Sequence, residues 1–250
     1  MSTAPATSTN ATPAAEKPRQ HVLALGAHAA DQELSAGMIL AKYARAGHRV
    51  TILSLTPGEK GHPTLGADDY ARQKIDEAKR CADLLGAESI VLPYGDATLE
   101  VTEALKFEVA DIIRDLKPTI LITHWQNSIH KDHRNAHVIA NDALFYAALK
   151  RIEREKPAHY IPTVYYSENW EDMEGYEPDV YVDTTDVFDA YCEALSAFEL
   201  WNGGTGWPYG DYYKSLARMR GCLGFGLRGQ YASTLMRPKG AHVRRVSDLP

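Results

Sequence analysis

Residues 21–28 read HVLALGAH, and this stretch together with the following Ala29-Ala30-Asp31 decides the fold. It is an apolar run of strand type, and a helix-like stretch begins just after it. Residues 119–125, TILITHW, repeat the arrangement and lead into His130-Lys131-Asp132-His133. In an open α/β sheet, the carboxyl ends of parallel strands meet at one edge, where ligands bind. The sequence therefore predicts that polar side chains from two distant segments meet at that edge.

These polar side chains form a donor set that suits a divalent metal. His28, Asp31 and His133 offer two imidazoles and one carboxylate, which zinc accepts, and three protein ligands leave one position open for water. Such a set supports metal-assisted hydrolysis. Taken singly, His28 would be an ordinary strand-end histidine and Asp31 an ordinary acid at a helix start. The second group, which follows in the expected order along the chain, favours a shared metal site.

Composition defines the class of protein. The chain has 250 residues, of which 44% are hydrophobic and 24% charged, which suits one large α/β domain. Its net charge of -6 argues against a nucleic-acid binder, because neutralising phosphates requires a basic surface. The cysteines, Cys81, Cys192 and Cys222, show neither a CxxC pair nor a disulfide framework, and we expect ordinary thiols of a reducing compartment.

The N-terminal segment differs in composition from the rest of the chain. Residues 1–20 are rich in Ala, Thr, Pro and Ser, and we expect them to form a disordered tail. They contain neither the basic region nor the apolar region of a secretion signal, and the sequence has no apolar run long enough to span a membrane. We therefore expect a cytoplasmic protein with one domain over 21–250, in which residues 152–250 complete the pocket of a core over 21–151.

From His21 onward, expected strands and helices alternate along the chain. This rhythm predicts a Rossmann-like, doubly wound, mostly parallel sheet in a three-layer α/β/α fold. The last third is less regular and carries most of the aromatic residues, which by default pack cores but could wall a pocket. We expect strands over 21–28, 49–55, 89–94, 119–125, 163–167 and 179–182, and helices over 33–45, 69–85, 102–116, 131–151, 187–201 and 209–223.

The segments GAHAADQELSAG and HKDHRNAH resemble the two signature motifs of the LmbE-like, or PIG-L, family of zinc-dependent de-N-acetylases. The first family motif reads AHPDDxE. In it the His and the second Asp bind the metal, and the first Asp is the general base. By resemblance, His28 and Asp31 are ligands and Glu33 supports them, but Ala30 stands at the base position. Ala29 replaces the motif's Pro, so the whole segment resembles a variant subgroup.

The second family motif, HxDH, implies roles for three more residues. By resemblance, His133 binds the metal and His130 faces the substrate carbonyl, while Asp132 hydrogen-bonds His130 and orients it. Three further segments, TPGEKG, KIDEAKRCADLLG and YGDATL, are similar to other family motifs, so that the resemblance spans residues 21–150. They offer Glu59, Lys74 and Asp96 as substrate contacts, although Glu59 and Lys74 are by default solvated residues.

The resemblance implies a carbon–nitrogen hydrolase that acts on a linear amide and removes an N-acetyl group from a small sugar derivative, with Zn²⁺ or another divalent metal. Related enzymes often form homo-oligomers. A positioned general base typically contributes about 100- to 10,000-fold in rate, so the loss at Ala30 needs a substitute. We expect His130 to take this role and Asp132 to tune its pKa.

Two other functions remain open. The first is a catalytically silent metal- or sugar-binding member of the same family. The second is a nucleotide-binding protein without a metal, which the lack of GxGxxG and GxxxxGK[ST] motifs disfavours. His137, one helical turn beyond His133, is expected to be a helix-surface histidine outside the ligand set.

Overall fold

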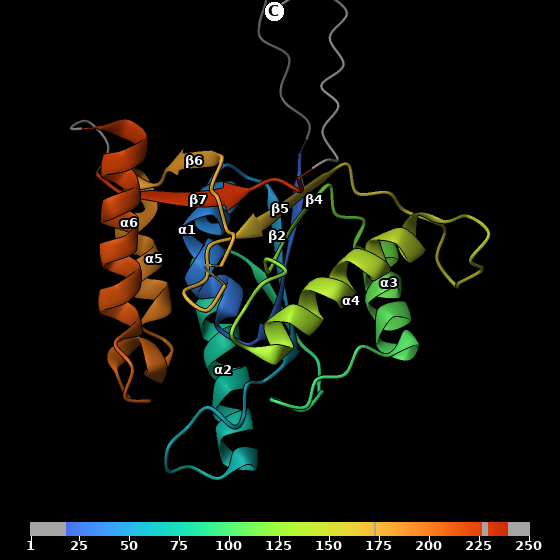
Figure 1. Cartoon of the computed structure of the whole chain (residues 1–250), viewed down its shortest axis with the longest axis horizontal. Coiled ribbons are helices and arrows are strands. Elements are labelled where there is room, and N and C mark those ends of the chain that lie inside the picture. Colours follow the sequence, from blue (N-terminus) through green and yellow to red (C-terminus); the bar gives the residue numbers. More distant parts are fainter. Residues whose placement is uncertain (1–18, 173, 227–229, 240–250) are drawn as a thin grey trace, which may run out of the picture.

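A seven-stranded sheet forms the centre of the computed structural model, which describes residues 19–172, 174–226 and 230–239 (Figure 1). Most of the tail expected over 1–20 therefore lies outside the described residues. The strands are β1 (His21–His28), β2 (Arg49–Thr56), β3 (Glu88–Val91), β4 (Ile120–Thr123), β5 (Thr163–Ser167), β6 (Val180–Asp183) and β7 (Ala232–Met236).

The strand order is β3-β2-β1-β4-β5-β7-β6. Strands β1 to β5 pair in parallel with one another, whereas β7 is antiparallel to both β5 and β6. This topology confirms the expected α/β fold with a mostly parallel sheet.

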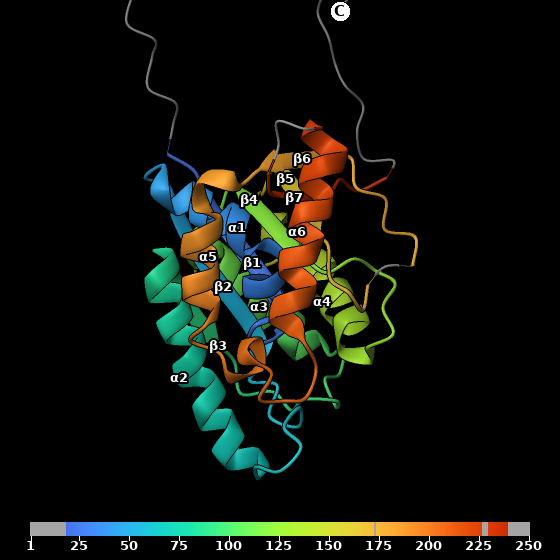
Figure 2. The ribbon, with the colours of Figure 1, turned by 90° about the vertical axis from the view of Figure 1, so that its left-hand side faces the viewer.

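Helices cover both faces of the sheet (Figure 2). One face packs against α1, α2, α5 and α6, and the other against α3 and α4. The helices are α1 (Asp31–Arg45), α2 (Ala67–Leu85), α3 (Glu103–Leu116), α4 (Lys131–Ala148), α5 (Phe188–Leu195) and α6 (Tyr209–Phe225).

The central strand β1 explains why its sequence is apolar throughout rather than alternating. Val22 and Ala24 belong to the core on the α1 side, and Leu23 and Leu25 belong to the core on the α3 side. All four side chains are fully buried. A parallel strand covered on both faces needs apolar residues at every position, because neither face meets water.

Three chain segments leave the sheet at the same edge. Strand β1 ends at His28, β4 at Thr123 and β5 at Ser167, and all three strands run in parallel. The residues that follow these strands therefore lie close together, although the sequence separates them widely. This edge is where the candidate site forms.

The helix expected over 187–201 is wrong in part. Helix α5 ends at Leu195, and a separate 3-10 turn spans Glu199–Asn202. Between them, Phe198 adopts an extended backbone and is fully buried. The break lets Phe198 and Trp201 both enter the core on the α1 side, which a continuous helix over these residues would not achieve.

The expected strands and helices also differ from the structure at other positions. Strand β7 was not predicted, because five residues at the far end of the chain become a strand only by inserting between β5 and β6. Strand β3 stops at Val91, shortly before Pro93, which has no N–H to donate. Helix α4 ends three residues earlier than expected, at Ala148.

Candidate metal centre

The carboxylate of Asp31 lies at the centre of the site. Its Oδ2 is 3.2 Å from His28 Nδ1 and 3.4 Å from His133 Nε2, so the structure brings the three proposed ligands together. The same oxygen accepts a hydrogen bond of 2.7 Å from the backbone N–H of His28 and lies 3.1 Å from His124 Nε2. Asp31 takes this position because it opens α1 directly after β1 ends.

Further carboxylates contact the imidazole nitrogens that face away from Asp31. His28 Nε2 lies 3.1 Å from Asp96 Oδ1 and 3.4 Å from Asp132 Oδ2. His133 Nδ1 lies 2.9 Å from Asp172 Oδ1. Each imidazole thus turns one nitrogen toward Asp31 and the other toward a carboxylate, which is the usual environment of metal-binding histidines.

The charges of this cluster suit a divalent cation. Burial lowers the pKa of His133, but Asp31 and Asp172 outweigh this effect and raise the pKa to about 10. Burial likewise opposes the charged form of His28, whose pKa Asp31 and Asp132 nevertheless raise well above its usual value. The carboxylates are therefore stabilised by positive charge nearby. A bound cation would supply this charge in place of the protons on the histidines.

Several overlapping groups of side chains place ligand atoms within 4.8 Å of one another, and these buried His and Asp residues could hold a metal. The buried Oδ1 of Asp132 has no hydrogen-bond partner among the described residues. The groups are His28–His130–His133, Asp31–His124–His133 and His28–Asp96–Asp132.

The structure corrects the expected contact between Asp132 and His130. The hydrogen bond between them runs from the backbone N–H of Asp132 to His130 Nδ1, at 3.2 Å, and caps the start of α4. The carboxylate of Asp132 faces His28 instead. His130 packs edge-on against His28, with ring centres 4.7 Å apart, and lines the pocket. Burial and the charges of His28 and His133 lower the pKa of His130.

Ala30 adopts a left-handed backbone, with φ of 91°, at the start of α1. Its backbone N–H donates to Glu33 Oε2 at 3.1 Å, so Glu33 closes the turn. The methyl group of Ala30 lines the pocket.

The three proposed substrate contacts have different environments. Lys74 was expected to be solvated by default but is buried and lines the pocket, with Nζ 4.9 Å from the centre of the Phe198 ring. Asp96 also lines the pocket. Glu59 accepts a hydrogen bond of 2.9 Å from the backbone N–H of Asp96 and so supports that residue. Burial lowers the pKa of Lys74, against the opposing charge of Glu33.

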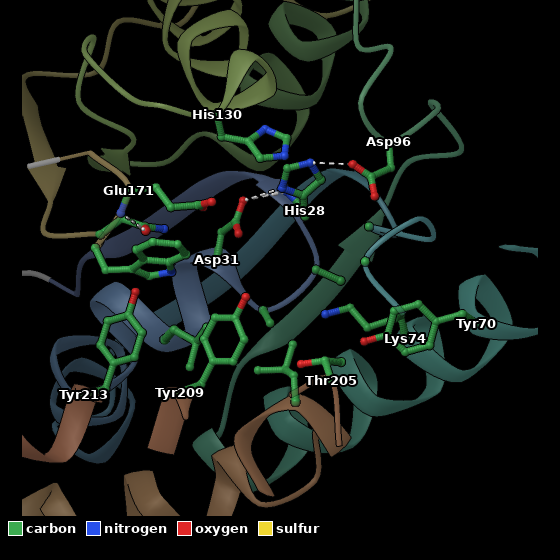
Figure 3. Close-up of a pocket in the computed structure, with 18 residues that line it drawn as sticks. His28, Asp31, Tyr70, Lys74, Asp96, His130, Glu171, Thr205, Tyr209 and Tyr213 are labelled. Carbon is green, nitrogen blue, oxygen red and sulfur yellow. Dashed lines mark hydrogen bonds and ion pairs between the residues drawn. The ribbon is translucent and has the colours of Figure 1, made fainter. Parts of the chain in front are cut away.

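The site opens into a pocket with a cavity of about 170 Å³ (Figure 3). Figure 3 shows His28, Asp31 and His130 on one side of the cavity, with Lys74, Thr205, Tyr209 and Tyr213 on the other. Trp170 completes the lining with its indole ring. Several aromatic residues of the last third therefore form the pocket as well as the core.

Sequence reasoning missed three residues of the site. His124 follows β4, and its Nδ1 lies 2.8 Å from Asp172 Oδ2. Asp172 and Glu171 follow β5, and Glu171 Oε2 lies 3.4 Å from His133 Nε2. Burial raises the pKa of Glu171. All three follow parallel strands that end at the site, so a search for polar residues after every such strand would have found them.

Several known proteins are similar to this chain in sequence. Residues 23–144 match the family described as PIG-L, GlcNAc-PI de-N-acetylase. The 4-oxalmesaconate hydratase of Pseudomonas putida is 26% identical over 82% of this chain and 81% of its own length. The diacetylchitobiose deacetylase of Thermococcus kodakarensis is 28% identical over 71% of this chain and 68% of its own length.

Solved structures share the fold at lower identity. The 4-carboxy-2-hydroxymuconate hydratase from Pseudomonas putida matches with a TM-score of 0.80 and 22% identity, over 92% of this chain and all of that one. The N,N'-diacetylchitobiose deacetylase from Pyrococcus horikoshii matches with a TM-score of 0.74 and 19% identity, over 87% of this chain and 83% of its own.

Residues 23–144 are therefore similar to the PIG-L/LmbE-like family, and the solved structures share the fold of this chain. The relatives named above are enzymes of two kinds, deacetylases and a hydratase. Among the residues that the structure describes, the helices are too short or too polar to cross a membrane.

Proposed function

We propose that this chain is a metal-dependent N-deacetylase that hydrolyses a linear amide bond in a small N-acetylated sugar derivative. The observation that carries the proposal is the convergence of His28 Nδ1 and His133 Nε2 on Asp31 Oδ2 beside the pocket. His28, Asp31 and His133 would hold a divalent cation there, Zn²⁺ by resemblance, which when bound would polarise a carbonyl and lower the pKa of water to about 7.

The charge of the pocket favours a neutral substrate. Three carboxylates line it, from Asp31, Asp96 and Glu171, against the single ammonium of Lys74. A divalent cation brings this lining close to neutral, so a substrate with several carboxylates would gain little attraction there. An uncharged polyol suits the hydrogen-bonding groups and the indole of Trp170 better.

His130 has the geometry of a hydrogen-bond donor to the substrate. Because Nδ1 accepts the N–H of Asp132, a neutral His130 ring carries its proton on Nε2. That N–H can donate a hydrogen bond to the substrate carbonyl oxygen and so stabilise the negative charge that develops there. The role of proton acceptor expected from the sequence requires the opposite tautomer. We therefore assign His130 the role of hydrogen-bond donor to the substrate and expect Ala30 to limit the rate.

Hydration of a carbon–carbon double bond is the second candidate. It is favoured by the Pseudomonas putida hydratase, which matches this chain over most of both lengths. Activation of water at a metal serves both reactions. The charge of the pocket argues against polycarboxylate substrates such as the name of that relative implies.

The test uses the full chain loaded with Zn²⁺. We expect release of primary amine from N-acetylated sugars, detected with fluorescamine, and its loss in Asp31→Asn. Unsaturated hydroxy acids, followed by loss of ultraviolet absorbance, test hydration in parallel. If wild type binds zinc and sugars but releases no amine, the deacetylase proposal fails and the silent binding function replaces it. Hydration without amine release would establish the second candidate.

A further inference from the structure

Asp172 connects two stacked histidines of the site. Its Oδ1 lies 2.9 Å from His133 Nδ1, and its Oδ2 lies 2.8 Å from His124 Nδ1. The two rings stack with their centres 4.1 Å apart, and all three side chains are buried. Asp172 follows β5 and lies outside residues 23–144, the segment that is similar to the PIG-L family. One carboxylate from this later segment thus contacts two histidines at once.

The Asp172 carboxylate determines which nitrogen of each ring carries a proton. Burial raises the pKa of Asp172, but His124 and His133 outweigh this effect and hold the pKa below its usual value, so the group is ionised. An ionised carboxylate only accepts hydrogen bonds, and Nδ1 of both rings must therefore be protonated. In a neutral ring the lone pair is then on Nε2. Both Nε2 atoms face Asp31 Oδ2, at 3.4 Å from His133 and 3.1 Å from His124.

The two Nε2 atoms differ in one contact. The backbone N–H of Ala27 donates to His124 Nε2 at 3.1 Å and occupies its lone pair. This nitrogen therefore has neither a proton to donate to Asp31 nor a lone pair to offer a metal. The described contacts of His133 Nε2 are instead the carboxylates of Asp31 and Glu171, which leave its lone pair available. Of the two stacked histidines, His133 is thus the one that can bind the cation.

The contact with Ala27 extends the influence of Asp172 to the other ligands. Ala27 lies in the last turn of chain before His28, the final residue of β1, and Asp31 follows directly at the start of α1. The hydrogen bond to His124 therefore fixes the backbone from which both of these ligands project. Asp172 holds the His124 ring in the orientation that this hydrogen bond requires.

We propose that Asp172 is a positioning residue of the metal centre. It directs Nε2 of His133 toward the cation and, through His124, fixes the end of β1. This inference rests on the metal centre of the proposed function. It keeps three protein ligands, so one position stays open for water.

The first experiment compares the zinc affinity of Asp172→Asn with that of Asp76→Asn, a matched change at an exposed acid of α2. Asparagine keeps the shape of the side chain but offers one acceptor oxygen, so it can accept from only one of the two Nδ1 protons. Competition with a chromophoric chelator should show zinc binding about 10- to 100-fold weaker in Asp172→Asn. Asp76→Asn should match wild type.

Nitrogen-15 NMR of the histidine rings in the zinc-loaded protein measures the tautomers directly. In wild type we expect a protonated Nδ1 on both rings, a metal-bound Nε2 on His133, and an Nε2 on His124 with neither proton nor metal. In Asp172→Asn, at least one ring should lose its preference for a proton on Nδ1. The wild-type spectrum tests the inference even where Asp172→Asn does not fold.

A pair of histidine variants separates the roles of the two rings. In His124→Gln the amide oxygen can still accept the N–H of Ala27, whereas His133→Gln removes a ligand. We expect His124→Gln to retain much more zinc affinity than His133→Gln. Equal losses would show that His124 also binds the metal and would overturn the inference.

The outcomes separate this inference from the proposed function. If wild type fails to bind zinc, both are wrong. If Asp31→Asn loses zinc while Asp172→Asn keeps wild-type affinity, only the positioning role of Asp172 is wrong. That role is also wrong if Asp172→Asn binds zinc more weakly but keeps both Nδ1 protons, because the loss would then come from the stability of the fold.

Discussion

Ala30 stands, by resemblance, where the family motif has a carboxylate, and its backbone conformation is unfavourable for alanine. Its φ of 91° lies in the left-handed region, which costs an alanine about 1–2 kcal/mol, whereas aspartate visits this region more readily. Ala30→Asp should therefore fold and bring a carboxylate to the pocket. We expect its deacetylation rate to exceed that of wild type by about 100- to 10,000-fold.

Amine release from the best substrate of wild type measures this gain. Ala30→Asn is the control, because it accepts the same backbone and adds similar bulk without a base. Equal rates for zinc-loaded Ala30→Asp and wild type would show that a base at position 30 is not limiting.

The stability of the fold should also depend on pH through His21, which lies at the opposite end of β1. Burial lowers the pKa of His21, and the ring meets the Leu116 carbonyl at 2.9 Å and the Thr51 hydroxyl at 2.9 Å. The pKa of His21 in the unfolded chain is 6.5. Below this pH, the unfolded chain binds a proton at His21, whereas His21 in the folded chain stays neutral. This group should therefore destabilise the fold as the pH falls below 6.5, by at most about 1.4 kcal/mol per pH unit.

Urea unfolding of metal-free protein at pH 7.5 and 5.5 checks this expectation. His21→Gln removes the titration, so its stability should fall less over this range than that of wild type. The nearby charges of Arg19, Arg49 and Glu88 remain in both proteins. Parallel pH profiles for the two proteins would refute the assignment.

At the scale of elements, α4 carries His130 and His133 at its first turn and depends on α3 at its last. Arg114 of α3 is fully buried and donates to five backbone carbonyls around the end of α4. This guanidinium satisfies carbonyls that the helix leaves unpaired, which explains why α4 ends at Ala148. The acceptors are Tyr146, Ala147, Leu149, Ile152 and Lys156, at 2.9–3.2 Å.

Arg114→Met should destabilise the protein by roughly 2–5 kcal/mol, because it leaves several buried carbonyls without a donor. Arg114→Lys should recover only part of this loss, since an ammonium lacks the planar array of donors. Arg72→Met, at an exposed arginine of α2, should change the free energy of unfolding by less than about 0.5 kcal/mol. Urea unfolding of the three variants measures these differences, and a stability of Arg114→Met near that of wild type would contradict them.

At the scale of the whole molecule, a metal held between segments from different strands should stabilise the folded chain. An ion that binds only the folded state contributes about 2.7 kcal/mol at a hundredfold excess over its Kd. Zinc should therefore raise the unfolding temperature of wild type and leave that of Asp31→Asn nearly unchanged. Thermal scans with and without a chelator measure the shift, and equal shifts in both proteins would place the stabilising ion elsewhere.

The sequence by itself determined the sheet and half of the site. The apolar run His21–His28 predicted a strand, and a second such run before His130 predicted another strand of the same parallel sheet that ends at the same edge. The structure pairs the two strands in parallel. Local patterns report such elements because periodicity and strand direction are properties of short segments. His28, Asp31 and His133 were found this way, and the structure brings them together.

Only the tertiary structure decided which other groups join them. Strand β7 exists because it inserts between β5 and β6, and α5 breaks so that Phe198 can be buried. His124, Glu171 and Asp172 have no local pattern that marks them, and the carboxylate of Asp132 turns to His28 rather than to its neighbour His130. These choices depend on burial, charge and packing between residues far apart in the chain, which no short segment of sequence contains.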